Sequence, residues 1–82
     1  MKTIKVEVRV FATLRKYLPE LTVGEPKHLE LPAGANFADL REQLGLPAEE
    51  VKIIMCNGVQ TEPEELVADG DRIAYIPAVG GG

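Results

Sequence analysis

The 82 residues of this chain suffice for one domain with one hydrophobic core, and they leave little material for an elaborate active site. A hydrophobic fraction of 45% with 27% charged residues is typical of a soluble globular domain, which argues against a disordered or membrane-spanning chain. The net charge of −4 without a basic stripe argues against nucleic acid as a partner, and one cysteine without an apolar leader sequence favours a cytoplasmic protein.

The first half of the chain changes its hydrophobic period twice. Apolar residues alternate with charged ones over residues 4–10, which predicts a strand with one buried face. Leu14 and Leu18 are then four apart and precede Pro19, so residues 11–18 are expected to form one or two helical turns. Residues 28–31 alternate again between two prolines, which is typical of a strand close to a sheet edge.

The main helix is expected to begin near Asn36, because asparagine is a good N-cap and Asp39 places negative charge in the first turn. Its apolar face consists of residues 37, 40 and 44, and Gly45 and Pro47 supply the stop signal. Residues 51–55 return to strand spacing. Asn57-Gly58 then predicts a tight hairpin with a short returning strand at residues 59–61.

The last third of the chain contains two turn signals and a strand. Thr61 and Glu64 have the spacing of a capping box with a proline between them, which predicts a single helical turn through Leu66. Asp69-Gly70-Asp71 marks a turn, and residues 72–76 are apolar enough for a strand inside the sheet. The element order predicts an α+β domain over residues 1–78, with a mixed sheet of four to five strands and one main helix packed across it.

Three motifs in this sequence resemble those of a known protein family. Phe11-Ala12-Thr13-Leu14-Arg15, the segment from Leu66 to Val79, and the glycines at the end resemble the ubiquitin-like sulfur carriers, above all the small subunit of molybdopterin synthase. The resemblance covers essentially the whole chain and implies a ubiquitin-like β-grasp fold. One departure is Gly80, which makes the ending a triple glycine where the family often has another residue before the diglycine.

The resemblance also implies a mechanism and its residues. The reactive group is the carboxylate of Gly82, which an ATP-using, ubiquitin-activating-like enzyme adenylates and a sulfur donor converts to a thiocarboxylate. The flexible tail, residues 79–82, enters partners, with Val79, Gly80 and Gly81 as the partner-binding residues. A larger molybdopterin synthase subunit receives the tail. The chain then acts as a non-catalytic subunit or co-substrate that binds no cofactor or metal of its own.

Other functions stay open at this point. A ubiquitin-like modifier would use the same activation but transfer Gly82 to a lysine of another protein. Close relatives in the sulfur-carrier family serve the tungsten cofactor, thiamine, cysteine or tRNA thiolation, so the final sulfur acceptor is open. A β-grasp interaction module with an inert tail is the third possibility, and its binding would survive the loss of the last two glycines.

The remaining chemical side chains are expected to be structural. Cys56 ends an apolar strand and is interpreted as a small core residue. His28 stands alone and is not expected to bind a metal or transfer protons. Gly58 and Gly70 are interpreted as turn glycines. An acidic series flanks the last strand and is expected to form a solvated face that could steer a basic activating enzyme: Glu62, Glu64, Glu65, Asp69 and Asp71.

Overall fold

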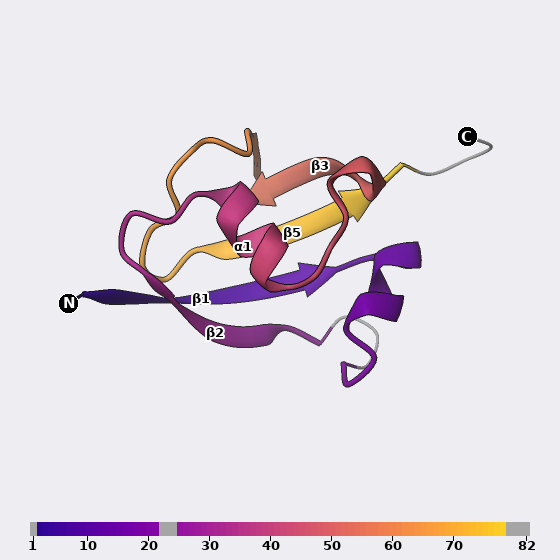
Figure 1. Ribbon diagram of the computed structural model, residues 1–82, viewed down its shortest axis with the longest axis horizontal. Coiled ribbons are helices and arrows are strands. Elements are labelled where there is room, and N and C mark those ends of the chain that lie inside the picture. Colours follow the sequence, from indigo (N-terminus) through magenta and orange to yellow (C-terminus); the bar gives the residue numbers. More distant parts are fainter. Residues whose placement is uncertain (1, 22–24, 79–82) are drawn as a thin grey trace.

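The computed structural model describes residues 2–21 and 25–78, which form a five-stranded sheet in the order β2-β1-β5-β3-β4. The helix α1 lies across one face of this sheet (Figure 1). β1 and β5 are parallel, and the pairs β1·β2, β3·β4 and β3·β5 are antiparallel. The predicted ubiquitin-like β-grasp fold is confirmed. The elements are β1 (Thr3–Val10), η1 (Ala12–Tyr17), β2 (Lys27–Pro32), α1 (Phe37–Gln43), η2 (Ala48–Glu50), β3 (Val51–Cys56), β4 (Val59–Thr61) and β5 (Arg72–Pro77).

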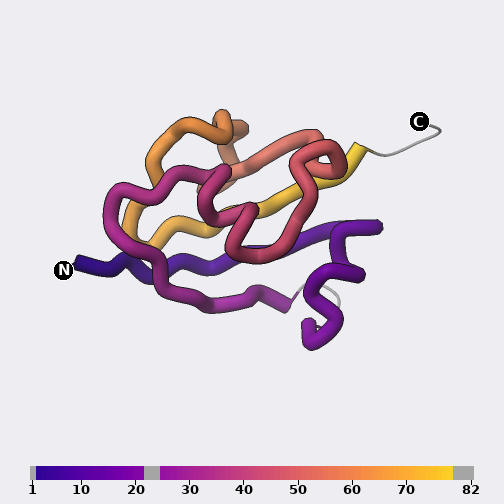
Figure 2. Tube along the Cα trace, viewed as in Figure 1, coloured from indigo at the N-terminus to yellow at the C-terminus, as the bar shows by residue number. Residues whose placement is uncertain are grey.

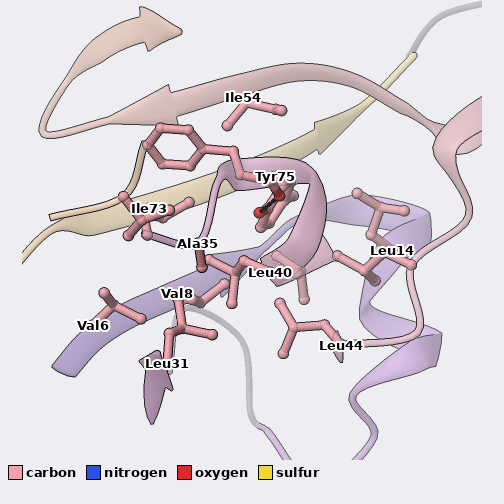
Figure 3. Packing of buried hydrophobic residues seen from close by; sticks show 14 of the residues in the cluster. Val6, Val8, Leu14, Leu31, Ala35, Leu40, Leu44, Ile54, Ile73 and Tyr75 are labelled. Atoms are coloured by element: carbon pink, nitrogen blue, oxygen red, sulfur yellow. Dashed lines mark hydrogen bonds between the residues drawn. The ribbon is translucent and has the colours of Figure 1, made fainter. Parts of the chain in front are cut away.

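The core lies between α1 and the sheet face that it covers (Figure 3). Successive side chains of a strand point to opposite faces, so every second residue of β1 and β5 is buried under the helix. Full burial of such an apolar side chain stabilises the fold by about 1.5–3 kcal/mol relative to exposure. The most completely buried side chains are Val8, Leu14, Leu31, Phe37, Leu40, Leu46, Ile73 and Tyr75.

The helix α1 begins where the sequence predicts. The Asn36 side chain accepts a hydrogen bond from the Asp39 amide at 2.8 Å, and the Asp39 carboxylate accepts from the Asn36 amide at 3.0 Å. This reciprocal capping box satisfies two amides that would otherwise have no partner. Gly45 follows the helix with a φ of 76°, a conformation that glycine adopts without strain. A buried hydrogen bond of 2.7 Å from the Tyr75 hydroxyl to the Phe37 carbonyl then fixes α1 to β5.

The predicted strand positions are confirmed, including β2 at one edge of the sheet and β5 between β1 and β3. The helical turns predicted after β1 are the 3-10 helix η1. Asn57 and Gly58 both have positive φ, 53° and 84°, as the predicted hairpin turn requires. The 3-10 helix η2 is an addition that the sequence pattern did not predict.

The helical turn predicted over residues 61–66 is wrong. This segment is a turn in which the Glu65 amide donates to the Glu62 carbonyl at 3.1 Å. Its carbonyls point at the start of α1 instead: Glu65 accepts from Phe37 and Pro63 accepts from Ala38. The segment therefore supplies partners for the first amides of α1, and that long-range requirement overrides the local capping pattern.

Candidate functional site

The end of β5 determines where the C-terminal residues leave the domain. β5 is paired on both sides, with β1 through Tyr75 and with β3 as far as Pro77, which lies opposite Val51. Pro77 is buried and Ala78 is exposed. The chain is therefore held by the sheet up to Pro77 and free of it one residue later.

The predicted site residues Val79, Gly80, Gly81 and Gly82 lie outside the described residues. Their roles stay predictions. The structure describes the chain as far as Ala78, the residue that precedes them.

Two short helices flank this end of the sheet. η1 follows the end of β1, which runs parallel to β5, and η2 precedes the start of β3, where Val51 lies opposite Pro77. The Tyr17 hydroxyl donates to the Glu50 carboxylate at 2.7 Å and joins the two helices. This hydrogen bond raises the pKa of Tyr17. The Lys16 ammonium lies 3.8 Å from the Glu50 carboxylate and over the Tyr17 ring. These contacts help to fix η1 against η2 beside the end of β5.

Cys56 is half-buried at the end of β3, and the Asn57 amide group donates to its sulfur at 3.5 Å. Burial, and then the nearby Asp71 carboxylate, raise the pKa of the thiol to about 11. A thiol is nucleophilic only as the thiolate. The environment of Cys56 therefore agrees with a structural residue and argues against a nucleophile.

We expect Cys56 to react slowly with iodoacetamide in the folded protein. With its pKa raised to about 11, the thiolate fraction at pH 8 is on the order of a hundredfold below that of an ordinary exposed thiol. The alkylation rate, followed by mass spectrometry, should rise steadily with pH up to about 11. The same protein unfolded in urea is the control, and equal rates in the two states would contradict the prediction.

His28 is exposed on the edge strand β2, opposite Glu7 in the register with β1. It lines a cavity of about 450 Å³ on the sheet face that α1 leaves open, together with Lys5, Glu30 and Arg72. Acidic and basic groups alternate around this cavity, so it offers no consistent charge to a ligand. Within residues 2–21 and 25–78, no three His, Cys, Asp or Glu side chains come together as a metal site would need.

The turn Asp69-Gly70-Asp71 also makes hydrogen bonds to other segments of the chain. Asp69 accepts a hydrogen bond from the Lys5 amide at 2.8 Å, and the Gly70 amide donates to the Lys5 carbonyl at 2.7 Å, which fixes the turn to β1. Asp71 is buried, with 9% of its surface exposed, and accepts from the Ala68 amide and the Asn57 side chain. The prediction that Asp71 lies on a solvated face is wrong. Its carboxylate is buried because it accepts two hydrogen bonds that fix the loop before β5.

The other members of the acidic series are exposed. Asp69 lies near the start of β5, the end opposite η1, and the orange segment before β5 in Figure 2 leads to this end. The six residues of β5 span roughly 16–20 Å, which exceeds the Debye length of about 8 Å at physiological salt, so Asp69 is poorly placed to steer an enzyme that acts on the tail. Glu62 directly follows Thr61, which pairs with Ile54 opposite Tyr75, so the expectation stays a prediction for this residue. Glu49 and Glu50 on η2 are also near the end of β5, and their sequence position gave no signal of this.

The helices of the described segments include none long and apolar enough to cross a membrane.

Known proteins are similar to this chain in sequence and in fold. A sequence model of the family described as Mut7-C ubiquitin matches residues 3–80. The HVO 2177 protein of Haloferax volcanii is similar at 26% identity, with a TM-score of 0.72, over 98% of this chain and 88% of that one. A putative molybdopterin converting factor, subunit 1, from Pyrococcus furiosus is similar at 27% identity, with a TM-score of 0.71, over 93% of this chain and 99% of that one.

A third similarity concerns the fold alone. The small archaeal modifier protein 1 of Haloferax volcanii is 18% identical, with a TM-score of 0.72, over 93% of this chain and 99% of that one. None of the curated proteins matches this chain.

Proposed function

This chain belongs to the Mut7-C ubiquitin family, and from that premise we propose that it is a sulfur carrier whose C-terminal carboxylate on Gly82 is activated and converted to a thiocarboxylate. It acts as the co-substrate of other enzymes. Its sulfur serves the synthesis of a dithiolene cofactor of the molybdopterin type.

The observation that carries this proposal is the way β5 ends. β5 is paired with β1 through Tyr75 and with β3 through Pro77, and the three glycines begin three residues after Pro77. Glycine has no Cβ, so such a segment can lie extended in a narrow cleft of a partner. The folded domain therefore anchors one end of a narrow C-terminal segment that carries the reactive group.

The chemistry requires activation from outside the chain. An α-carboxyl group is ionised at neutral pH and is a poor acyl donor. A ubiquitin-activating-like enzyme would join this carboxylate to the α-phosphorus of ATP and release pyrophosphate. Sulfide would then attack the acyl carbon: a C–S bond forms, the C–O bond to AMP breaks, and AMP leaves with the electron pair. The product is a thiocarboxylate, whose sulfur is a nucleophile.

The proposal that the sulfur serves molybdopterin synthesis rests on one of the similar proteins. The Pyrococcus furiosus protein that is similar to this chain is described as a molybdopterin converting factor subunit. By this analogy, the tail would enter a larger partner subunit and deliver its sulfur to a pterin precursor.

A protein modifier is the second candidate, and the similarity in fold to small archaeal modifier protein 1 favours it. The activation would be the same. The nucleophile would be a lysine amine of another protein, and the product would be an isopeptide bond through Gly82.

The test is the mass of the chain after incubation with an ATP-dependent activating enzyme and sulfide. Exchange of one oxygen for sulfur adds about 16 mass units, nominally the same as the oxidation of one methionine. The tryptic peptide that follows Arg72 resolves this ambiguity, since residues 73–82 contain neither methionine nor cysteine. We expect the gain to be in this peptide and to depend on ATP.

Two results would contradict the proposal. An enzyme that is competent on another carrier but leaves residues 73–82 unmodified would remove the sulfur-carrier function for that pairing. Conjugates that join Gly82 to lysine, without any thiocarboxylate, would establish the modifier instead.

A further inference from the structure

The outer edge of β2 has no part in the core or in the proposed function. β2 is the outermost described strand on its side of the sheet, next to β1 (Figure 1). An edge strand presents main-chain N–H and C=O groups to which a further strand can bind. Pro26 and Pro32 limit this pairing to residues 27–31, because proline has no N–H to donate.

The hydrogen bonds of β1 show which groups of β2 face outward. The Lys5 amide and carbonyl bond to the turn before β5 at 2.8 and 2.7 Å, and the Glu7 amide bonds to the same turn at 3.0 Å. These groups therefore point away from β2. Glu30 lies opposite Lys5, and His28 lies opposite Glu7, so these two pairs exchange no hydrogen bonds across the ladder. The N–H and C=O groups of His28 and Glu30 therefore point to the free edge, and neither amide donates to a loop or side chain of the described residues.

The sequence of β2 is nearly symmetric about Leu29. Counting outward from Leu29 in either direction, the second-nearest outward position is a proline, and the nearest is His28 on one side and Glu30 on the other. Two antiparallel copies of β2 with Leu29 on their twofold axis would place His28 of each copy opposite Glu30 of the other. Each such pair exchanges two main-chain hydrogen bonds, so the two outward amides of each copy all find acceptors.

Other antiparallel registers fit less well. A shift by two residues in one direction places Glu30 opposite the second copy's Glu30, and the opposite shift places His28 opposite the second copy's His28. Like charges directly opposite each other are destabilising. Both shifts also set a proline against an outward amide or carbonyl, where the proline cannot donate. A shift by one residue would set outward groups against inward ones. The register centred on Leu29 is therefore favoured by both charge and hydrogen bonding.

The side chains on the open sheet face favour the same register. Arg72, Glu7 and His28 are neighbours across β5, β1 and β2. The pairing continues this row with the second copy's Glu30 and then with its Lys5, which are themselves neighbours. Basic and acidic side chains thus alternate along the whole row. A histidine ring carries an N–H donor in either protonation state, so a carboxylate opposite it has a partner.

We propose that the free edge of β2 binds the same edge in a second copy of this chain, so that the two five-stranded sheets become one. The inference goes beyond the proposed function and does not depend on it, because β1 separates β2 from the strand that leads to the tail. A few main-chain hydrogen bonds with their adjoining side chains make a small interface, so the dimer should dissociate on dilution.

The test is sedimentation equilibrium of the full chain from about 10 μM to about 1 mM, the range in which weak dimers dissociate. His28→Pro removes one outward amide from each copy and leaves the ladder with β1 intact. The matched control is Gln60→Pro on β4, the opposite edge of the sheet. Gln60 follows Val59, which pairs with Cys56 to close the hairpin, so its amide also faces outward. Circular dichroism confirms that both variants are folded.

We expect the average mass of the wild type and of Gln60→Pro to rise from 8.9 kDa toward twice this value as the concentration increases. His28→Pro should dimerise at least about tenfold more weakly, because two hydrogen bonds of the dimer are lost and their acceptors stay unpaired. A wild-type chain that remains at 8.9 kDa at the highest concentration would overturn the inference. So would equal dimerisation of His28→Pro and the wild type, or a loss of dimerisation in Gln60→Pro.

A cross-linking experiment tests the register without a proline. In a Cys56→Ala background, Leu29→Cys places two thiols on the twofold axis, in a pair whose Cα atoms are about 4.5 Å apart, within the range of a disulfide. Oxidised glutathione should then produce a covalent dimer. Lys27→Cys is the control, because its two copies lie four positions apart along the paired strands, roughly 13 Å. Equal cross-linking of the two variants, or none of Leu29→Cys, would contradict the proposed pairing.

Discussion

Deletion of Gly82 is expected to abolish sulfur loading while leaving the fold unchanged. The shortened chain still ends in a glycine carboxylate, so its intrinsic chemistry is the same. Its reactive group, however, lies about 3.5 Å closer to the sheet, and a misplacement of even 1 Å in a reacting complex can cost about a hundredfold in rate. The measurement is the thiocarboxylate content of the C-terminal peptide after incubation with enzyme, ATP and sulfide.

The matched control is Gly80→Ala. It keeps the length and the terminal Gly81-Gly82 pair, and it places a non-glycine residue where the resembling carriers often have one. Because this variant keeps the distance from β5 to the carboxylate, it should load sulfur far faster than the shortened chain, even if the added Cβ weakens partner binding. Loading of the Gly82-deleted chain at the wild-type rate would show that the activating enzyme does not read the distance from β5 to the carboxylate.

Most of the fold was predictable because its signals are local. Alternation over β1, the Asn36 cap of α1 and the Asn57-Gly58 turn each depend on a few neighbouring residues, and each is present in the structure. Capping and turn chemistry specify where an element begins and ends, independently of what packs against it.

The errors arise where a distant partner decides. Thr61 and Glu64 have capping-box spacing, but the carbonyls of Pro63 and Glu65 are used by amides of α1, more than twenty residues earlier in the chain. Asp71 stands in an acidic stretch, and its burial depends on Asn57. No window of neighbouring residues contains either pairing.

The candidate site, like the fold, was predictable from the sequence only in part. The reactive tail was suggested by the resemblance, whereas the surroundings of the end of β5 depend on contacts between distant segments, such as the hydrogen bond from Tyr17 to Glu50. The sequence showed Phe11 as part of a family motif, without indicating that its ring stays outside the core. Exposure of an aromatic residue beside the end of β5 becomes visible only after the strands are placed.

Asp71→Ala should cause the largest loss of stability among substitutions in the acidic series. The Asp71 carboxylate accepts from the Ala68 amide at 2.8 Å and from the Asn57 side chain at 3.0 Å. Asn57 in turn exchanges two hydrogen bonds with the backbone of Arg72, so one carboxylate connects the β3–β4 hairpin to the entry of β5. Its removal leaves both donors without this acceptor. We expect the free energy of unfolding to fall by about 3 kcal/mol, measured by urea denaturation.

Two matched variants separate the network from charge alone. Glu64→Ala removes an exposed carboxylate from the same series and should change the stability by less than about 0.5 kcal/mol. Asp71→Asn keeps the shape but offers one acceptor oxygen to two donors, so its loss should be intermediate, about 1–2 kcal/mol. If Asp71→Ala were no more destabilising than Glu64→Ala, the carboxylate would be dispensable to the loop. If instead the three variants follow this order, the contribution of Asp71 comes from its two hydrogen bonds, and the loop before β5 fixes the start of the strand that leads to the tail.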